Sequence, residues 1–299
     1  MSPAETRLIG CAIVSLVLTN MTAVSMLILL CFTIFGIILG SFSNSLVHRL
    51  PRKMLEEYNA AAREELDLPA LPTNPVLRSA RSHCPHCSAQ LAWYDNIPLV
   101  SWLVLKAKCR HCSAPIPARY FVQEVAGGVI GLVCALSFGL SWQGAALFAA
   151  AFLLMWLVVI DFEHMLLPES LNYSLLGVGI AAGATGLFVT PEKALWGMMA
   201  GYLALCIPAL IFKKIRGVAG VGEGDWLLLA ALGAFVGPMA IIPVLLLGSL
   251  ASISGHVAVG AKRETQLPFG PALALGGIAT FVWMRLPDYH PEMLRPFLT

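Results

Sequence analysis

Charged side chains are scarce in this sequence, because Asp, Glu, Lys and Arg make up only 12% of its 299 residues. Soluble domains average about 25%. The charges nearly cancel, to a formal net charge of +2, which argues against the strongly basic surface that nucleic-acid-binding proteins use. Hydrophobic residues make up 58% of the chain, and the mean hydropathy is +0.78. The composition predicts a membrane protein that is surrounded by lipid and has no nucleic acid as a partner.

Signature motifs of several enzyme classes are also missing. No HExxH occurs, which argues against a membrane zinc protease. No GxSxG elbow occurs either, which argues against a serine protease. No GxGxxG follows a predicted strand, so no dinucleotide-type loop can be assigned. No internal repeat or low-complexity tract is recognisable.

Eight apolar stretches are long enough to be considered as membrane helices, since a helical span takes about 20 residues. They cover 24–47, 121–140, 143–160, 170–189, 193–212, 225–239, 240–260 and 269–286. Pro238 leaves 225–260 open as either two short helices or one long helix. The 8–22 stretch either lengthens the first span or lies at the interface, and we interpret it as part of a retained anchor, with a cleaved signal peptide as the alternative. The expected fold class is an all-α polytopic membrane protein with about eight transmembrane helices.

The loop at 48–120 fixes the expected orientation. It contains ten basic residues, namely Arg49, Arg52, Lys53, Arg63, Arg78, Arg81, Lys106, Lys108, Arg110 and Arg119. Short cytoplasmic loops carry such an excess of Lys and Arg, so this loop is predicted to be cytoplasmic. Three regions follow: an N-terminal segment with the first span at 1–47, a cytoplasmic loop at 48–120 with a small module at about 80–117, and a transmembrane bundle at 121–299.

Four of the eight cysteines form two CxxC pairs, Cys84 with Cys87 and Cys109 with Cys112. Four thiolates at this spacing can bind one Zn²⁺ in a closed tetrahedral site, which is typical of a structural metal. A module this small has too little core to fold without such a metal, and thiols in the cytosol stay reduced. We therefore expect a zinc-ribbon-like module, with a metal-free or redox CxxC as the alternative.

After residue 120 the chain has only three aspartates, Asp161, Asp225 and Asp288. Asp161 ends one predicted span and Asp225 begins another, and the predicted topology places both at the cytoplasmic edge. Carboxylates at a membrane boundary are unfavourable and usually serve a function. Two carboxyl groups held close together share a proton, so one can activate a water while the other hydrogen-bonds a scissile carbonyl. Asp161 and Asp225 are therefore candidates for an aspartic peptidase pair, although their spacing does not establish that they meet.

Two other interpretations of these carboxylates stay open. Each aspartate can simply cap a helix or reach the membrane interface, and Asp225 is suited to capping because it begins its span. The second interpretation is a metal site of acidic and imidazole ligands, formed by Glu163, His164, Glu169 and Glu223. From the residues alone, a transporter or membrane scaffold whose charged groups bind an ion or proton is also an alternative.

An ordered set of motifs resembles the prepilin peptidases, also called type IV leader peptidases, from about residue 36 to residue 280. The matching segments are Gly40-Ser41-Phe42 with Asn44, His48-Arg49-Leu50-Pro51, Trp93-Tyr94-Asp95-Asn96-Ile97-Pro98 between the CxxC pairs, Ala118-Arg119-Tyr120, Ile160-Asp161 with Leu167-Pro168, Gly222-Glu223-Gly224-Asp225 and Leu267-Pro268-Phe269-Gly270-Pro271. Archaeal preflagellin peptidases and presenilin-like proteases share the GxGD motif, but they are not expected to carry the four-cysteine module.

The resemblance implies a function, a location and a cofactor. Asp161 and Asp225 would cleave the basic leader of type IV prepilins and type II secretion pseudopilins at the cytoplasmic face of the bacterial inner membrane. Members with the cysteine module often methylate the new N-terminus with S-adenosylmethionine, so a second activity is implied, with a peptidase lacking methyltransferase activity as the alternative. No residue is assigned to the methyl donor. The sequence departs from the family at Glu169, where an aspartate often follows the Leu-Pro pair.

Overall fold

The protein is described from a computed structural model that places residues 23–69, 82–84, 86–218, 220–260 and 268–286. Residues 8–22, Arg78, Arg81, Asp288 and Leu267, all named above, lie outside these ranges.

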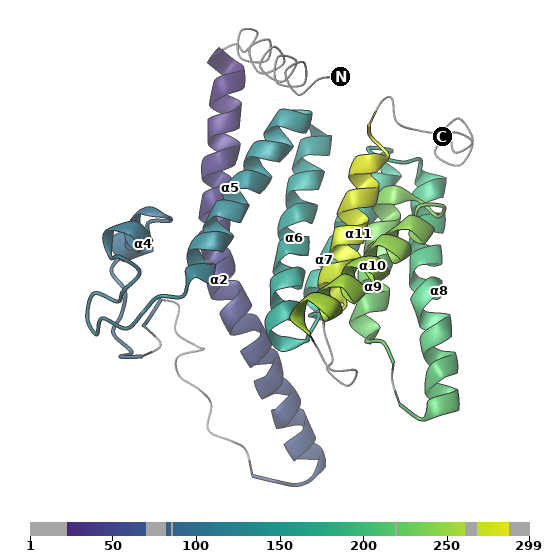
Figure 1. Cartoon of the computed structure of the whole chain (residues 1–299), viewed down its shortest axis with the longest axis horizontal. Coiled ribbons are helices and arrows are strands. Elements are labelled where there is room, and N and C mark those ends of the chain that lie inside the picture. Colours follow the sequence, from purple (N-terminus) through teal and green to yellow (C-terminus); the bar gives the residue numbers. More distant parts are fainter. Residues whose placement is uncertain (1–22, 70–81, 85, 219, 261–267, 287–299) are drawn as a thin grey trace.

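Helices make up the fold, and the described ranges contain only two isolated β-bridges and no strand. The all-α prediction is therefore confirmed (Figure 1). The helices are α2 (Ala23–Glu65), η1 (Trp93–Asn96), α4 (Val100–Val104), α5 (Ala118–Phe138), α6 (Trp142–His164), α7 (Glu169–Ala184), α8 (Pro191–Arg216), α9 (Glu223–Val236), α10 (Ile241–Val259) and α11 (Gly270–Trp283).

Each of the eight predicted spans coincides with one long helix, from α2 and then from α5 to α11. Within the described residues, five of these helices are long and apolar enough to cross a membrane: α2, α5, α6, α8 and α10. Helices α7, α9 and α11 are shorter, with 16, 14 and 14 residues. The chain breaks around Pro238, so 225–260 forms two helices, and α2 continues past residue 47 as far as Glu65.

Glycines let neighbouring helices approach closely. A Cβ atom on Gly36 of α2 would lie 2.2 Å from the Gly127 carbonyl oxygen of α5. A Cβ atom on Gly197 of α8 would lie 2.1 Å from the Gly233 carbonyl oxygen of α9. Small residues at helix contacts are characteristic of membrane bundles, where close backbone packing drives association. This packing fixes α2 against α5 on one side of the bundle and α8 against α9 on the other (Figure 1).

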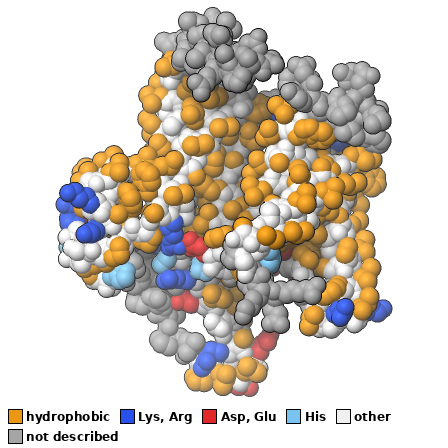
Figure 2. Space-filling model, viewed as in Figure 1, with side chains coloured by type: hydrophobic (Ala, Val, Ile, Leu, Met, Phe, Trp, Pro, Cys, Tyr) orange, Lys and Arg blue, Asp and Glu red, His pale blue; other side chains and the backbone are white. Residues whose placement is uncertain are grey.

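The surface is apolar over most of the bundle and charged at one end. Figure 2 shows hydrophobic side chains covering the upper part of the molecule, with acidic, basic and histidine side chains gathered towards the lower end. Leu30, Val129 and Leu250 are each more than half exposed. Apolar exposure on this scale marks contact with lipid rather than with water. The chain is a membrane protein, as its composition predicted.

Candidate active site and cysteine centre

Asp161 lies in the last turn of α6, at the charged end of the bundle. Its side chain is only 5% exposed, and its Oδ2 atom accepts a 2.9 Å hydrogen bond from the backbone N–H of Gly270, which begins α11. Helix α6 ends because Met165 adopts a left-handed conformation with φ 52°. An aspartate in the last turn opposes the helix dipole, so Asp161 does not serve as a helix cap.

Asp225 occupies the first turn of α9, which begins after Gly222. Its side chain is 8% exposed. The carboxyl group interacts with the Gly222 backbone N–H, as a residue of a capping box does. Capping does not account for the whole group, however, because Asp225 Oδ1 is buried without a hydrogen-bond partner in the part of the chain that the structure describes.

The structure brings the two aspartates together. One side chain, Leu167, connects the surroundings of the two carboxyl groups. A Cβ atom on Gly224 would lie 2.6 Å from Leu167 Cβ, and a Cβ atom on Gly270 would lie 3.3 Å from Leu167 Cδ2. Leu167 therefore packs between the residue that precedes Asp225 and the residue that hydrogen-bonds Asp161.

Asn172 on α7 positions the start of α9, where Asp225 lies. Its side chain is fully buried, and its Nδ2 atom donates a 3.1 Å hydrogen bond to the Gly224 carbonyl oxygen. This bond fixes the start of α9 relative to α7. The two carboxyl groups thus sit on a rigid frame made by α6, α7, α9 and α11.

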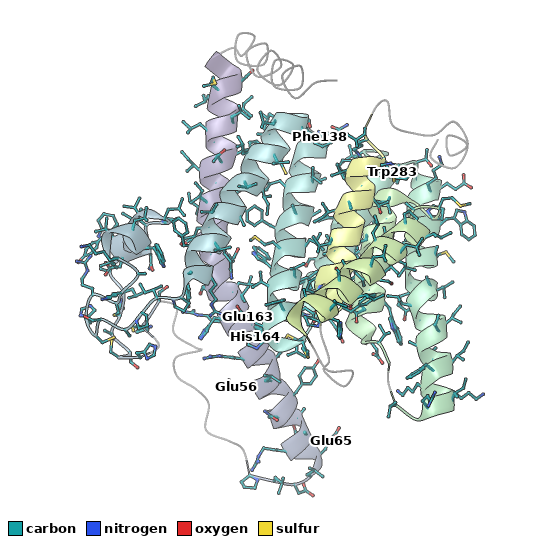
Figure 3. All side chains as sticks on the ribbon, in the orientation of Figure 1. Glu56, Glu65, Phe138, Glu163, His164 and Trp283 are labelled. Carbon is teal, nitrogen blue, oxygen red and sulfur yellow. The ribbon has the colours of Figure 1, made fainter. Side chains whose placement is uncertain are left out.

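Glu163 and His164, labelled in Figure 3, lie at the lower end of α6 beside α2. The Glu163 carboxylate forms an ion pair with Arg119 at the start of α5 and lies 3.9 Å from His164. Glu169 and Glu223 are exposed in the first turns of α7 and α9. Among the residues described, these four side chains do not assemble into a metal site, and the four cysteines are the one group that could hold an ion.

The four predicted cysteine ligands, Cys84, Cys87, Cys109 and Cys112, converge. Their sulfur atoms all lie within 4.8 Å of one another, and Cys84 Sγ is 3.8 Å from Cys112 Sγ. Two sulfurs bound to one Zn²⁺ at tetrahedral corners lie about 3.8 Å apart, given Zn–S bonds of about 2.3 Å. The donor set and its dimensions therefore fit a tetrahedral metal ion.

Each CxxC pair belongs to a similar turn. Residues 84–89 and 109–114 share the pattern Cys-X-His-Cys-Ser-Ala, a short repeat that went unrecognised in the sequence. In each turn the serine has a positive φ, 56° at Ser88 and 57° at Ser113. The N–H of the first cysteine bonds the carbonyl of the alanine that follows, at 2.9 Å for Cys84 and 2.8 Å for Cys109.

Backbone N–H groups also point at the sulfur atoms. The amides of Cys112 and His111 donate to the Cys109 sulfur and lower the pKa of this thiol to about 6. At Cys112 the Ala114 amide also lowers the pKa, but burial and the neighbouring cysteine sulfurs outweigh it and raise the pKa to about 11. Metals bind the thiolate form, so only the Cys109 sulfur is poised for a metal by its own turn.

Comparison with known proteins places the chain in a family. The model of the bacterial peptidase A24 N-terminal domain matches residues 34–138, and the model of the type IV leader peptidase family matches residues 147–255. A prepilin leader peptidase/N-methyltransferase of Stutzerimonas stutzeri is 41% identical over 260 residues, covering 85% of this chain and 90% of the relative. The chain belongs to the type IV leader peptidase family.

Other relatives of the type IV leader peptidase family carry the same name. A protein of Xanthomonas campestris is 36% identical over 254 residues, which cover 83% of this chain and 88% of the relative. A protein of Burkholderia pseudomallei is 39% identical over 255 residues, which cover 83% of this chain and 82% of the relative. No solved structure was found to match the chain.

Three structural features of this type IV leader peptidase family member were not found from sequence. Gly270 appeared only within a motif, without a role, and it lies beyond residue 255, where the family model ends. Asn172 was not identified from the sequence, and Arg119 was not paired with Glu163. The sequence shows an asparagine within an apolar stretch and opposite charges near predicted helix ends, but neither pattern specifies a partner far along the chain.

Proposed function

We propose that Asp161 and Asp225 are the catalytic pair of an aspartic peptidase that cleaves the basic leader of prepilins and type II secretion pseudopilins at the cytoplasmic face of the membrane. As a member of its family the chain is a prepilin peptidase with N-methyltransferase activity. Family membership favours this function over the ion- or proton-coupled transporter. The proposal adds the residues, their roles, the substrates and the side of the membrane.

The observation that carries the proposal is the unequal hydrogen bonding of two adjacent, buried carboxyl groups. Each carboxyl group has one backbone N–H partner, Gly270 for Asp161 and Gly222 for Asp225, but Asp225 Oδ1 is buried without a hydrogen-bond partner within the described chain. A buried carboxyl oxygen that lacks a donor favours the neutral, protonated form of the group. We therefore assign Asp161 as the general base and Asp225 as the group that holds the shared proton.

The chemistry follows from these assignments. Asp161 takes a proton from a water molecule, whose oxygen attacks the scissile carbonyl carbon. Asp225 donates a hydrogen bond to the carbonyl oxygen and then supplies its proton to the leaving amine. Because both groups are buried and their positions are fixed by Leu167 and Asn172, little reorganisation is needed when charge develops.

The position of the pair suits a substrate that stays in the membrane. Asp161 is in the last turn of α6, at the end that Glu163 and His164 mark in Figure 3, so a prepilin helix can remain among the apolar helices while its leader reaches the acidic pair. Helix α2 extends beyond this end and carries Glu56 and Glu65 (Figure 3). These carboxylates are exposed, as on any solvated helix face, and they would also attract a basic leader.

We also propose that the metal held by the four cysteines is Zn²⁺ and that it is structural. A four-thiolate shell leaves no open coordination position for substrate or water. Bound zinc would supply folding free energy to a module whose η1 and α4 helices contain no buried residue. The ion takes no part in peptide hydrolysis.

The test is mass spectrometry of a purified prepilin incubated in detergent with the full chain, with and without S-adenosylmethionine. We expect a mass loss equal to the leader in both samples and a further gain of one methyl group only when the methyl donor is present. An intact prepilin, under conditions where a relative cleaves it, would contradict the proposal.

Replacing Gly270 with Ala tests the positioning of Asp161. The new Cβ atom would lie 2.6 Å from Asp161 Oδ2, so the carboxyl must shift. A displacement of about 1 Å in an active site lowers rates by about 100-fold, and we expect cleavage by G270A to fall by that order. The matched control is Gly177→Ala on α7, where a Cβ atom would meet nothing within 4 Å. Equal initial rates for both variants in the prepilin assay would refute the role of Gly270.

A further inference from the structure

A cavity of about 370 Å³ lies between the middle of α2 and the cysteine module, within the roughly 300–1,000 Å³ typical of small-molecule sites. Its walls come from three parts of the chain: α2, the 82–117 module and the start of α5. Neither catalytic aspartate lines it. The peptidase mechanism therefore leaves this cavity unused.

Three residues that line the cavity each carry one buried polar atom without a hydrogen-bond partner in the described chain, namely Asn44 Oδ1, Asp95 Oδ2 and Trp102 Nε1. The rest of each side chain is firmly held. Asn44 Nδ2 donates to the Tyr120 carbonyl oxygen at 3.2 Å, and the Trp102 ring packs on Phe121 with centroids 4.9 Å apart. Buried polar atoms are nearly always satisfied in native proteins, so three unpaired atoms among the residues of one cavity wall indicate a site that a polar ligand completes.

The charges around the cavity indicate what kind of ligand this is. Glu124 is 7% exposed and accepts a 2.7 Å hydrogen bond from the Leu99 N–H, but none of the ion pairs found in the described residues includes it. The Asp95 side chain is 3% exposed, and its Oδ1 atom is paired with Arg110. Buried charges are normally paired, so we expect the ligand to bring a positively charged group that pairs with the Glu124 carboxylate.

The remaining walls offer two further kinds of contact. Arg49 and Arg52 bring guanidinium groups that can bind a carboxylate. Trp102 and Tyr120 bring aromatic rings on which a nucleobase can stack. A ligand that fits this combination carries a positive centre, a carboxylate, hydroxyl groups and an aromatic base.

We propose that this cavity binds S-adenosylmethionine and is the site of N-methylation. Its sulfonium would face Glu124, its carboxylate would face Arg49 and Arg52, and its ribose hydroxyls would lie beside Asn44 and Asp95. This assignment rests on the N-methyltransferase activity of the family. It locates a site for which no sequence motif exists.

The cavity is also well placed to receive the product of cleavage. Tyr120 lines it, and the preceding residue, Arg119, forms an ion pair with Glu163, which is two residues from Asp161 on α6. Glu163 lies at the lower end of α6 (Figure 3), so the cavity and the acidic pair share one end of the bundle. The N-terminus released at the aspartates would therefore emerge at the same end as the methyl donor.

The methyl transfer balances without any further reagent. The uncharged α-amino nitrogen of the cleaved pilin attacks the methyl carbon and forms an N–C bond. The C–S bond breaks and its electron pair stays on sulfur, so S-adenosylhomocysteine is released. The resulting secondary ammonium loses its extra proton to water.

The first experiment maps where the methyl donor binds. The full chain in detergent is irradiated with tritiated S-adenosylmethionine, and the labelled peptides are identified by mass spectrometry. We expect label in peptides from 41–52, 82–117 or 120–124. Label confined to another segment would overturn the location while leaving the methyltransferase function intact. A wild-type chain that cleaves prepilin but neither binds nor transfers the methyl donor would overturn the function itself, and this site with it.

The second experiment tests the charge of Glu124 with Glu124→Gln, in which the new side-chain oxygen can still accept from the Leu99 N–H. We expect S-adenosylmethionine to bind at least tenfold more weakly, and S-adenosylhomocysteine, which lacks the sulfonium charge, to be affected less. Glu192→Gln, exposed at the start of α8, is the matched control and should bind both as the wild type does. Unchanged donor affinity in Glu124→Gln, or an equal loss for both ligands, would overturn the proposal. The labelling of the wild type decides the location if this variant fails to fold.

Discussion

Asp225→Asn should abolish prepilin cleavage, with a rate at least about 100-fold and up to about 10,000-fold below that of the wild type. The amide has nearly the same shape as the carboxyl group, so the packing at the start of α9 is retained. It has no acidic proton to supply to the leaving amine. Initial rates of leader removal, followed by mass spectrometry at saturating prepilin, measure the effect.

Asp161→Asn should be equally inactive for a different reason. An amide cannot take a proton from the attacking water, and its NH₂ group can face the Gly270 N–H, which would remove the 2.9 Å hydrogen bond that now holds the carboxylate. Methylation of a prepilin supplied without its leader should survive in both variants, because neither aspartate lines the cavity beside the cysteine module.

The control for both substitutions is Asp67→Asn, at an exposed position beyond α2. Its φ of 50° is one that asparagine adopts readily, so this variant should cleave at the rate of the wild type. Cleavage by Asp225→Asn within tenfold of the Asp67→Asn control would exclude the aspartic mechanism.

The helices and the cysteine cluster could be predicted because both depend on local pattern. Apolar stretches of membrane length identify spans without reference to the rest of the fold. Likewise, each CxxC pair makes its own turn, as Ser88 and Ser113 show. Only the meeting of the two turns depends on distant contacts.

The surroundings of Asp161 could not be predicted in this way. Its hydrogen-bond donor, Gly270, is 109 residues away in the sequence, and the contact exists only because α11 packs against α6. Helix α2 also continues beyond the predicted span, through Pro51 to Glu65, into a stretch rich in strong helix formers.

The cavity beside the module illustrates the same limit for a binding site. Asn44, Asp95 and Glu124 come from three separate segments, and the unpaired oxygens of the first two and the buried carboxylate of the third have meaning only once the fold shows that they line one cavity. No spacing of these residues in the sequence predicts that they meet. Missing hydrogen-bond partners can be recognised only from the three-dimensional structure.

Cys84→Ser should remove the metal from the cysteine centre. In zinc-finger peptides a structural Zn²⁺ contributes about 10–16 kcal/mol of apparent binding free energy. Losing one of four thiolates would then weaken zinc binding on the order of 100-fold or more. Zinc per chain, measured by elemental mass spectrometry after dialysis against a mild chelator, should fall from one ion to a small fraction.

Loss of zinc should also open the module, because the pairing of its two turns depends on the metal. Lys106, Lys108 and Arg110 lie in or beside the second turn, so trypsin should cut there in Cys84→Ser before it cuts the helical bundle. Cys31→Ser is the matched control, since Cys31 is exposed on α2 and outside the cluster, and it should keep its zinc and resist trypsin at these sites. A Cys84→Ser protein that retains one zinc ion and shows the control's digestion pattern would mean that the four sulfurs do not hold the metal, and that the convergence of the two turns is stabilised by packing alone.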